Sequence, residues 1–300
     1  MTDYKLTLGP LLYNWPADKA RDFYFHVADE VDVDRVYIGE VVCSKRQPLH
    51  AKYFPEVVQR LQDAGKEVVL STLALIMNER EIAFLKDTAA ASSLMIEAND
   101  IAAVSLLAGK PFVCGPFINT YNEDTLMAME SLGATSVVLP FELPRSSLAA
   151  LAKHARVPLE VQVFGRLPLA MSARCYHARA YNLHKDNCQF VCERDADGMD
   201  VHTIDQQPFL AVNGTQVQSF TCCNLINEID DLRSLGISQF RISPQAMDMK
   251  TIVSAFRNML EHSVTAGETM ATLHAASEGM EFANGYYHAV PGKNYRNISE

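Results

Sequence analysis

The sequence alternates between short apolar, β-branched runs and stretches with helical periodicity. The runs expected to form strands are Lys5–Leu12, Arg35–Glu40, Glu67–Leu75, Ser93–Glu97, Pro111–Val113, Ser136–Phe141, Leu159–Phe164 and Gln239–Ile242. Apolar strands that alternate with helices are typical of a parallel sheet buried on both faces. This count and the chain length predict an α/β fold, a TIM-like (β/α)₈ barrel, regular or distorted. An open doubly wound sheet is the alternative, but no glycine-rich phosphate turn follows the first run.

The regular alternation stops between Phe164 and Gln239. We therefore predict a single barrel domain over 1–300, with a cysteine-bearing insertion over 165–238 after the seventh strand. Within it, Asn213-Gly214 lies between two alternating runs and predicts a hairpin turn. Long irregular excursions in a compact domain are usually functional.

Charge and hydropathy exclude several classes of protein. The formal net charge of −10 argues against nucleic-acid binding, which needs a basic face. The sequence contains no run of roughly eighteen apolar residues, so we expect no membrane span. Its first residues do not have the pattern of a secretory signal. We therefore expect a cytoplasmic protein. In that reducing compartment, clustered cysteines more often bind metal or perform chemistry than form disulfides.

Five of the seven cysteines lie in the insertion, and three of these, Cys175, Cys188 and Cys192, form a C-x₁₂-C-x₃-C pattern. Soft thiolate ligands suit iron–sulfur clusters and zinc alike. A four-thiolate site needs one more cysteine. Cys43 is the best candidate because it follows a strand end, whereas Cys114 directly follows an apolar run.

The spacing leaves three possibilities: an iron–sulfur cluster, a zinc site with His177 or His184 as the fourth ligand, and unligated thiols. Against zinc, only the Cys188–Cys192 pair comes near a zinc knuckle. Nearby cations favour a cluster, because a cluster with four thiolates carries net negative charge. These cations are Lys45, Arg46, Arg174, Arg179 and Lys185.

Polar residues recur where the expected strands end, and active sites of barrels lie at this rim. They are Glu40, Thr72, Glu97, Asn119, Glu142 and Gln162. The alternative is that they are solvated loop starts. Glu40, Glu97 and Glu142 are candidates for proton handling or for structural hydrogen bonds, so the catalytic residues are left unassigned.

Several segments resemble the collagenase-like peptidase superfamily, within it a member that works in oxygen-independent ubiquinone biosynthesis. They are LGP, YIGEVVCSKR, VLSTLAL, IEAND, GRLPLAMSARCY and RISPQ, and the resemblance runs from Leu8 to about Tyr286. It implies a barrel-like fold and a [4Fe–4S] cluster held by Cys43, Cys175, Cys188 and Cys192. The chain lacks the HGA-x-C arrangement of the wider superfamily, which weakens a peptidase expectation, and no role transfers to Cys114, Cys222 or Cys223.

The resemblance implies an iron–sulfur subunit of an oxygen-independent hydroxylase of ubiquinone precursors, with prephenate as oxygen donor. It implies a heterodimer with a paralogous cluster-bearing subunit, and a lipid-binding partner that supplies the quinone intermediate. A non-catalytic electron-transfer or scaffold role is the alternative. A peptidase is disfavoured because the sequence has neither H-E-x-x-H nor G-x-S-x-G. A Cys175–His177 pair is two residues apart, so its side chains point in different directions on regular structure.

Overall fold

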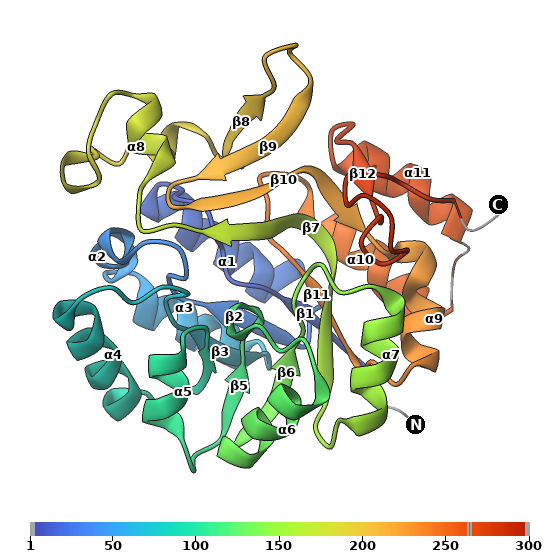
Figure 1. Ribbon diagram of the computed structural model, residues 1–300, viewed down its shortest axis with the longest axis horizontal. Helices are drawn as coiled ribbons and strands as arrows, with labels where there is room; N and C mark the ends of the chain where they lie inside the picture. The colour runs from blue at the N-terminus through green and yellow to red at the C-terminus, as the bar shows by residue number, and fades with distance from the viewer. Residues whose placement is uncertain (1–3, 263, 265, 298–300) are drawn as a thin grey trace.

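The computed structural model describes residues 4–262, 264 and 266–297. Its centre is a closed barrel of parallel strands (Figure 1). The barrel strands are β1 (Lys5–Leu8), β2 (Arg35–Ile38), β3 (Glu67–Ser71), β4 (Met95–Ala98), β5 (Phe112–Cys114), β6 (Ala134–Val138), β7 (Leu159–Met171) and β11 (Gln239–Ile242). Each strand pairs with the next, and β11 closes the ring by pairing with both β7 and β1. The predicted (β/α)₈ barrel is confirmed.

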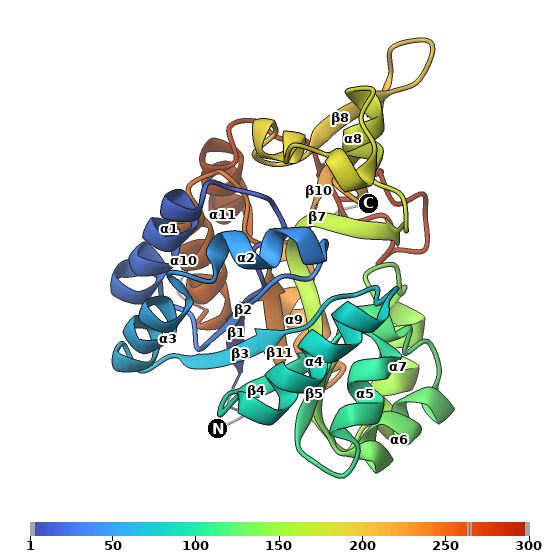
Figure 2. The same ribbon diagram turned by 90° about the vertical axis from the view of Figure 1, so that its left-hand side faces the viewer.

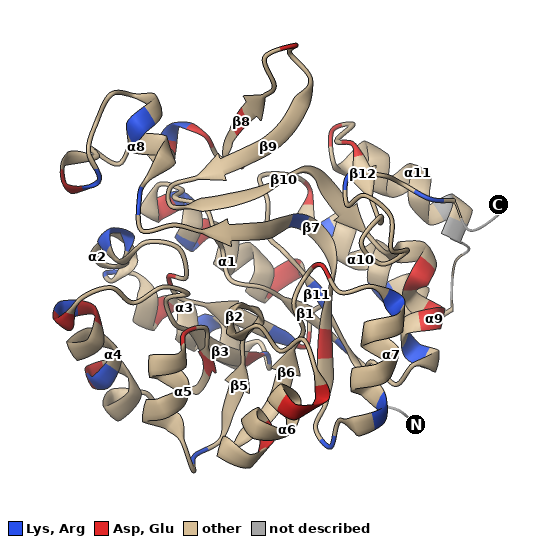
Figure 3. Cartoon of the chain, viewed as in Figure 1, with Lys and Arg blue, Asp and Glu red and all other residues tan. Residues whose placement is uncertain are grey.

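Helices surround the barrel and cover the outward faces of its strands. They are α1 (Ala17–Glu30), α2 (Gln47–His50), α3 (Phe54–Asp63), α4 (Glu79–Ala91), α5 (Ile101–Leu107), α6 (Glu123–Leu132), α7 (Arg145–His154), α9 (Ile229–Ser234), α10 (Met249–Leu260) and α11 (Ala266–Ala276). Asparagine side chains cap two of them, with Asn78 accepting from Glu81 N and Asn122 from Thr125 N. Apolar residues of helices and strands form one large core between the two layers. Basic and acidic residues are interspersed over the helices (Figure 3).

The inside of the barrel holds a buried ionic network. Arg241 donates to Glu97 at 2.7 Å and to Glu160 at 2.5 Å, and Tyr37 donates to the second oxygen of Glu160 at 2.7 Å. Glu97 was expected at the rim, but it is fully buried within β4 and paired with this arginine. It is therefore a structural residue of the barrel interior. Burial alone would raise the pKa of Glu160, but Arg241 and Arg35 outweigh burial and hold that pKa below its ordinary value.

The seventh strand continues beyond the barrel and carries a second layer of structure. β7 pairs antiparallel with β10 (Gln216–Asn224), which pairs with β9 (Pro208–Asn213), and β9 pairs with β8 (Met199–His202). The short strand β12 (Phe282–Ala283) pairs with β10. Together with α8 (Tyr176–Ala180), the strands β8–β10 form an arm that stands above one end of the barrel (Figure 2). No helix in the described residues is long and apolar enough to cross a membrane.

Candidate functional site

Four cysteines from distant parts of the chain line one cavity between the barrel and the arm. Its volume is about 340 Å³, open space at its mouth included. The cysteines are Cys43, Cys175, Cys188 and Cys192, and the other lining residues are Lys45, Arg46, Lys185, Phe190, Val191 and Gly214. We call this the cysteine cavity. The structure thus brings together the four thiols singled out from the sequence, together with three cations.

Glu40 fixes the loop that carries Cys43. After β2 the chain turns at Gly39, whose φ of +115° suits glycine. The carboxylate of Glu40 then accepts hydrogen bonds from the backbone N–H groups of Val42 and Cys43, each at 2.8 Å. Burial raises the pKa of Glu40, and Arg46 and the two N–H groups oppose that shift. Glu40, a candidate for proton handling, therefore positions the Cys43 backbone.

The hairpin turn between β9 and β10 holds both cysteine-bearing segments. The hydroxyl of Thr215 donates to Val42 O at 2.8 Å, which ties the turn to the Cys43 loop. Tyr176 N donates to Gly214 O at 3.0 Å, which ties the turn to α8. Cys175 is the N-cap of α8, and its sulfur accepts from Ala178 N at 3.4 Å. The turn predicted from Asn213-Gly214 thus joins the two sides of the cavity.

The remaining two thiols lie on a tight irregular segment. Cys188 follows the 3₁₀ turn η3 (Lys185–Asn187), and Cys192 lies in η4 (Val191–Arg194). Between them, Gln189 and Phe190 have φ values of +50° and +52°. Residues with a Cβ adopt this left-handed conformation at a cost of about 1–2 kcal/mol each. Such strain persists where the surroundings enforce it, and it clusters at functional sites.

Arg46 supplies buried positive charge beside the thiols. It is 1% exposed and donates to Leu12 O and to Asn213 Oδ1, each at 2.9 Å. Its charge acts on both Cys43 and Cys192. At the rim, Lys45 Nζ donates to Lys185 O at 2.6 Å. The arrangement provides the cationic surroundings expected around a thiolate-rich centre.

Two of the five cations singled out from the sequence lie away from this centre. Arg174 and Arg179 are exposed and do not line the cavity. Of the thiols, Cys43 and Cys175 have raised pKa values because both are largely buried, although Arg46 opposes the shift in each. Metal binding at these positions must therefore displace protons.

Four thiols are a donor set used both by zinc sites and by iron–sulfur clusters. No group of three or more His, Cys, Asp or Glu side chains in the described part of the chain could hold one metal ion. Yet four thiols surround the same cavity. A zinc site needs its ligands within about 2.3 Å of one point, whereas a cubane is held by thiolates at its separate iron corners. The soft sulfur atoms of the four cysteines suit either group by their chemistry.

Neither histidine proposed as a zinc ligand lines the cavity. His177 is fully buried, and Gly214 N donates to its Nδ1 at 3.3 Å. The ring proton therefore lies on Nε2, which donates to Asp195 at 2.7 Å. Both ring nitrogens are thus used. His184 is exposed.

A family comparison is consistent with this geometry. The family model described as "Peptidase family U32" matches residues 19–297. The chain belongs to peptidase family U32. This confirms, at the level of the family, the resemblance to collagenase-like peptidases.

Solved structures similar to this U32 protein include a DAHP synthase and tryptophan synthases. The DAHP synthase of Thermotoga maritima has a TM-score of 0.45 and 9% identity, covering 94% of this chain and 71% of its own. The tryptophan synthase complex of Pyrococcus furiosus has a TM-score of 0.41 and 12% identity, with coverage of 92% and 98%. The tryptophan synthase of M. tuberculosis has a TM-score of 0.38 and 12% identity, with coverage of 90% and 93%. All three scores are below 0.5, so the barrel assignment rests on the strand order.

The structure gives this U32 protein no cysteine–histidine nucleophile of the kind considered from the sequence. The sulfur of Cys175 accepts from Ala178 N, and His177 is paired with Asp195 and Gly214. An activated thiol needs its base within hydrogen-bonding reach and a lowered pKa. Here the pKa of Cys175 is raised. These contacts do not support peptidase chemistry at this pair.

The other three cysteines lie outside the cysteine cavity. Cys114 is fully buried in β5 and its sulfur contacts the hydroxyl of Thr120 at 3.8 Å. Cys222 and Cys223 are neighbours in β10. Cys222 donates to Gln245 at 3.8 Å, whereas Cys223 lines a second cavity. None of these three cysteines lies where it could serve as one of the four ligands.

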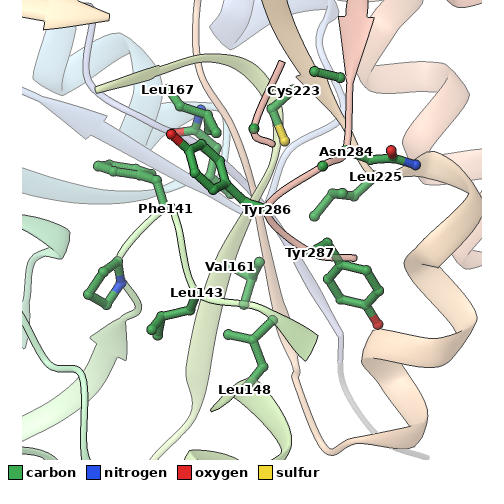
Figure 4. A pocket seen from close by; sticks show the side chains of 15 residues that line it. Phe141, Leu143, Leu148, Val161, Leu167, Cys223, Leu225, Asn284, Tyr286 and Tyr287 are labelled. Carbon is green, nitrogen blue, oxygen red and sulfur yellow. The ribbon is translucent and has the colours of Figure 1, made fainter. Parts of the chain in front are cut away.

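The second cavity, which we call the mouth cavity, is lined by the loop after β6, by β7 and by the segment from residue 283 to residue 292, and Figure 4 shows it from close by. Of the rim residues expected from the sequence, Gln162 lines it. Thr72 donates to Glu97 O at 3.0 Å, Asn119 has a φ of +60°, and Glu142 accepts from the hydroxyl of Tyr121. Sequence reasoning did not find the mouth cavity, although the Asn284-Gly285-Tyr286 segment that closes it marked the end of the family resemblance.

Proposed function

We propose that this U32 protein is a UbiV-like iron–sulfur subunit of an oxygen-independent hydroxylase of ubiquinone precursors. In this proposal Cys43, Cys175, Cys188 and Cys192 hold a [4Fe–4S] cluster. The observation that carries it is the convergence of these four thiols on one cavity with three cations. Family membership alone leaves the reaction undefined, since a fold supports many activities.

The residues around the cavity have separate tasks in this proposal. The cysteines bind through their thiolates, and Arg46 balances their charge from a buried position. Ala178 N donates toward the sulfur of Cys175, a contact of the kind that tunes a thiolate ligand. Glu40 holds the Cys43 loop. When bound, a [4Fe–4S] cluster supplies one-electron chemistry that amino-acid side chains lack.

The oxygen donor and the partners come from the resemblance to UbiV. It implies prephenate as donor, a heterodimer with a paralogous UbiU-like subunit, and a lipid-binding UbiT-like protein that delivers the quinone precursor in the cytoplasm. At the outer hairpin of the arm, Ile204 and Phe209 are 102% and 57% exposed, and a partner that covers them would remove apolar surface from water.

A second role is electron transfer or scaffolding, with the catalytic residues in the UbiU-like subunit. The specific observation in its favour is that no carboxylate or histidine lines the cysteine cavity in the described residues. Glu40 lies nearby, but its carboxylate is bonded to backbone N–H groups. General acid–base catalysis needs such a group within reach of the reacting atoms. In both roles the chain is required for the anaerobic reaction.

A genetic experiment tests the proposal. A strain without this protein should make ubiquinone in air but accumulate under-hydroxylated precursors without oxygen. The wild-type chain and a Cys114→Ala control should restore the product, whereas Cys175→Ala should not. Normal anaerobic ubiquinone in the deletion strain, with no second copy of the protein, would refute the assignment to this pathway.

A further inference from the structure

We propose that His177 is a positioning residue, whose contacts set where the thiols of Cys175 and Cys192 lie. The His177 side chain is fully buried and does not line the cysteine cavity. It is close in sequence to both thiols, because Cys175 lies two residues before it and its partner Asp195 lies three residues after Cys192. The effect on a bound metal group rests on the proposed function, whereas the contacts of His177 do not.

Each ring nitrogen of His177 contacts a different part of the chain. In the hairpin turn, Gly214 N donates to Nδ1 at 3.3 Å, so the ring proton lies on Nε2, which donates to Asp195 Oδ2 at 2.7 Å. The backbone adds a third contact, since His177 N donates to Gly214 O at 3.4 Å. One residue thus joins α8, the turn between β9 and β10, and the chain that leaves η4.

The bond to Asp195 closes a loop of irregular structure. The stretch between the two partners consists of the end of α8, turns and the short 3₁₀ helices η3 and η4. It includes Asn182, Gln189 and Phe190, which have φ values of +56°, +50° and +52°. Holding the ends of a loop together reduces the number of conformations that the loop can adopt. The bond therefore restricts a segment that has little regular structure of its own.

Ring contacts hold the imidazole in this orientation. Tyr181 stacks on His177 with ring centroids 6.3 Å apart and ring planes 2° apart. The guanidinium of Arg194 lies over the Tyr181 ring, 4.8 Å from its centroid. Both kinds of contact are favourable at these separations. Because Arg194 directly precedes Asp195, the stacked groups join the same two segments as the hydrogen bond does.

The contacts of His177 reach two thiols through short pieces of backbone. Cys175 is the N-cap of α8, and its sulfur accepts from Ala178 N at 3.4 Å, so fixing α8 also fixes this sulfur. Cys192 lies in η4, and Asp195 is the residue that ends η4. Residues that hold metal ligands in place without binding the metal typically change its affinity 10–100-fold when they are replaced. We therefore expect His177 to act on the metal through Cys175 and Cys192.

The hairpin turn extends this arrangement to a third thiol. The turn held by His177 carries Asn213, whose Oδ1 accepts from Arg46 at 2.9 Å. Arg46 lies three residues after Cys43 in the loop that follows β2. Contacts within the protein thus place three of the four thiols. Cys188 is the exception, because it lies between η3 and η4 in the middle of the closed loop.

Hydrogen exchange of the metal-free full-length protein tests the closure without any assumption about the metal. His177→Ala should raise exchange at least tenfold in the amides of residues 176–195 and of the hairpin turn, while the barrel strands exchange as in the wild type. His184→Gln changes an exposed histidine of the same segment and is the matched control, with no change expected. Wild-type exchange throughout this segment in His177→Ala would overturn the inference.

Variants of the partner separate positioning from general destabilisation. The Asp195 side chain is 28% exposed, so its replacement disturbs the core less than that of His177. Asp195→Asn keeps an oxygen that accepts from Nε2 and should exchange like the wild type, whereas Asp195→Ala should resemble His177→Ala. The double variant should exchange no faster than either alanine variant, because both lose the same contact. Equal effects of Asp195→Asn and Asp195→Ala would contradict a role for this bond.

Iron release connects the closure to the thiols. In anaerobically reconstituted protein, a chelator should remove iron at least tenfold faster from His177→Ala and Asp195→Ala than from the wild type, with Asp195→Asn and His184→Gln at the wild-type rate. Wild-type release from both alanine variants, despite their faster hydrogen exchange, would overturn the positioning of the thiols. Absence of a cluster from the wild type would contradict the proposed function and not the closure, which hydrogen exchange decides.

Discussion

The guanidinium of Arg46 and the side-chain amide of Asn213 form a hydrogen bond of 2.9 Å that ties the Cys43 loop to the hairpin turn of the arm. The same arginine contacts the backbone of Leu12 in the loop after β1. Three segments far apart in the sequence thus meet at one buried cation. Because Arg46 also lies beside Cys43 and Cys192, this contact sets both the shape and the charge of the cysteine cavity.

Gly214→Ala should disturb this contact. A Cβ at Gly214 would lie 2.6 Å from Arg46 Nη2, and the residue has a φ of +63°. Gly65→Ala is a matched control, since Gly65 has a φ of +76° with nothing within 4 Å of its Cβ position. Both variants should lose about 1–2 kcal/mol from backbone strain. Only Gly214→Ala should also lose iron, and equal iron contents would contradict the role of the turn.

Replacing Glu40 should weaken metal retention without abolishing it. Glu40→Gln keeps one acceptor for the N–H groups of Val42 and Cys43 but places an amide near Arg46, which lies 4.0 Å from the carboxylate. We expect iron release to a chelator to be several times faster than in the wild type. Glu142→Gln, in the loop after β6 and four strands away around the barrel, should release iron at the wild-type rate. Identical rates for the two variants would show that Glu40 does not hold the loop.

The network inside the barrel should control stability. Arg241→Met leaves Glu97 buried without its cation and Glu160 with Arg35 alone, and should reduce the free energy of unfolding by about 3–5 kcal/mol. Arg60→Met, which removes an exposed pair with Asp29, is the control and should have little effect. Urea unfolding followed by circular dichroism measures both. A small effect of Arg241→Met would contradict the structural role of the network.

The same network predicts a pH dependence. The pKa of Glu160 is lowered in the folded protein, so its ionised form contributes stability above about pH 4.3, the ordinary value for glutamate. That contribution is lost as the pH falls through the lower pKa of the folded state. Between pH 5 and pH 3 the wild type should therefore lose more stability than Glu160→Gln. Parallel losses in urea unfolding at these pH values would contradict the assignment.

The barrel could be predicted from sequence because its signal is repeated. Each strand is a short apolar run, and a helix pattern follows most of them, so an error at one element does not change the architecture. The ionic network escaped prediction because a charge inside an apolar strand, such as Glu160 in LEVQVF, gives no sign of its partner. Arg241 meets it only after the barrel closes.

The four cysteines as metal ligands stay a prediction from the sequence, and the residues that support their loops were not predicted. The spacing in the sequence grouped Cys175, Cys188 and Cys192. Its place after a strand end made Cys43 the best candidate for the fourth ligand, and the family resemblance implied it. The roles of Arg46 and Glu40 depend on side-chain directions at the end of β2, which sequence patterns do not specify. The positions of Arg174 and Arg179 were uncertain for the same reason, and both point to solvent.

Loss of the cluster should loosen the segment from Cys175 to Cys192. Apart from α8, this segment consists of turns and short 3₁₀ helices with three residues in the left-handed region, Asn182, Gln189 and Phe190. Bound thiolates would fix it, so limited proteolysis should cut there much faster in protein from which iron has been removed. Cutting elsewhere, for example in the exposed turn between α3 and β3, should be unchanged and serves as an internal control. Equal rates within the segment would mean that metal does not organise it.

The central claim is that four cysteines hold one cluster, and the iron and sulfide content of anaerobically purified protein tests it most directly. The wild type should contain about four iron and four sulfide per chain, as expected for a cubane. Cys43→Ala removes one of the four thiolates and should lose this iron and sulfide. Cys114→Ala should retain them, because Cys114 does not line the cysteine cavity. Stoichiometric zinc without iron in the wild type, or full iron in Cys43→Ala with loss in Cys114→Ala, would contradict the account.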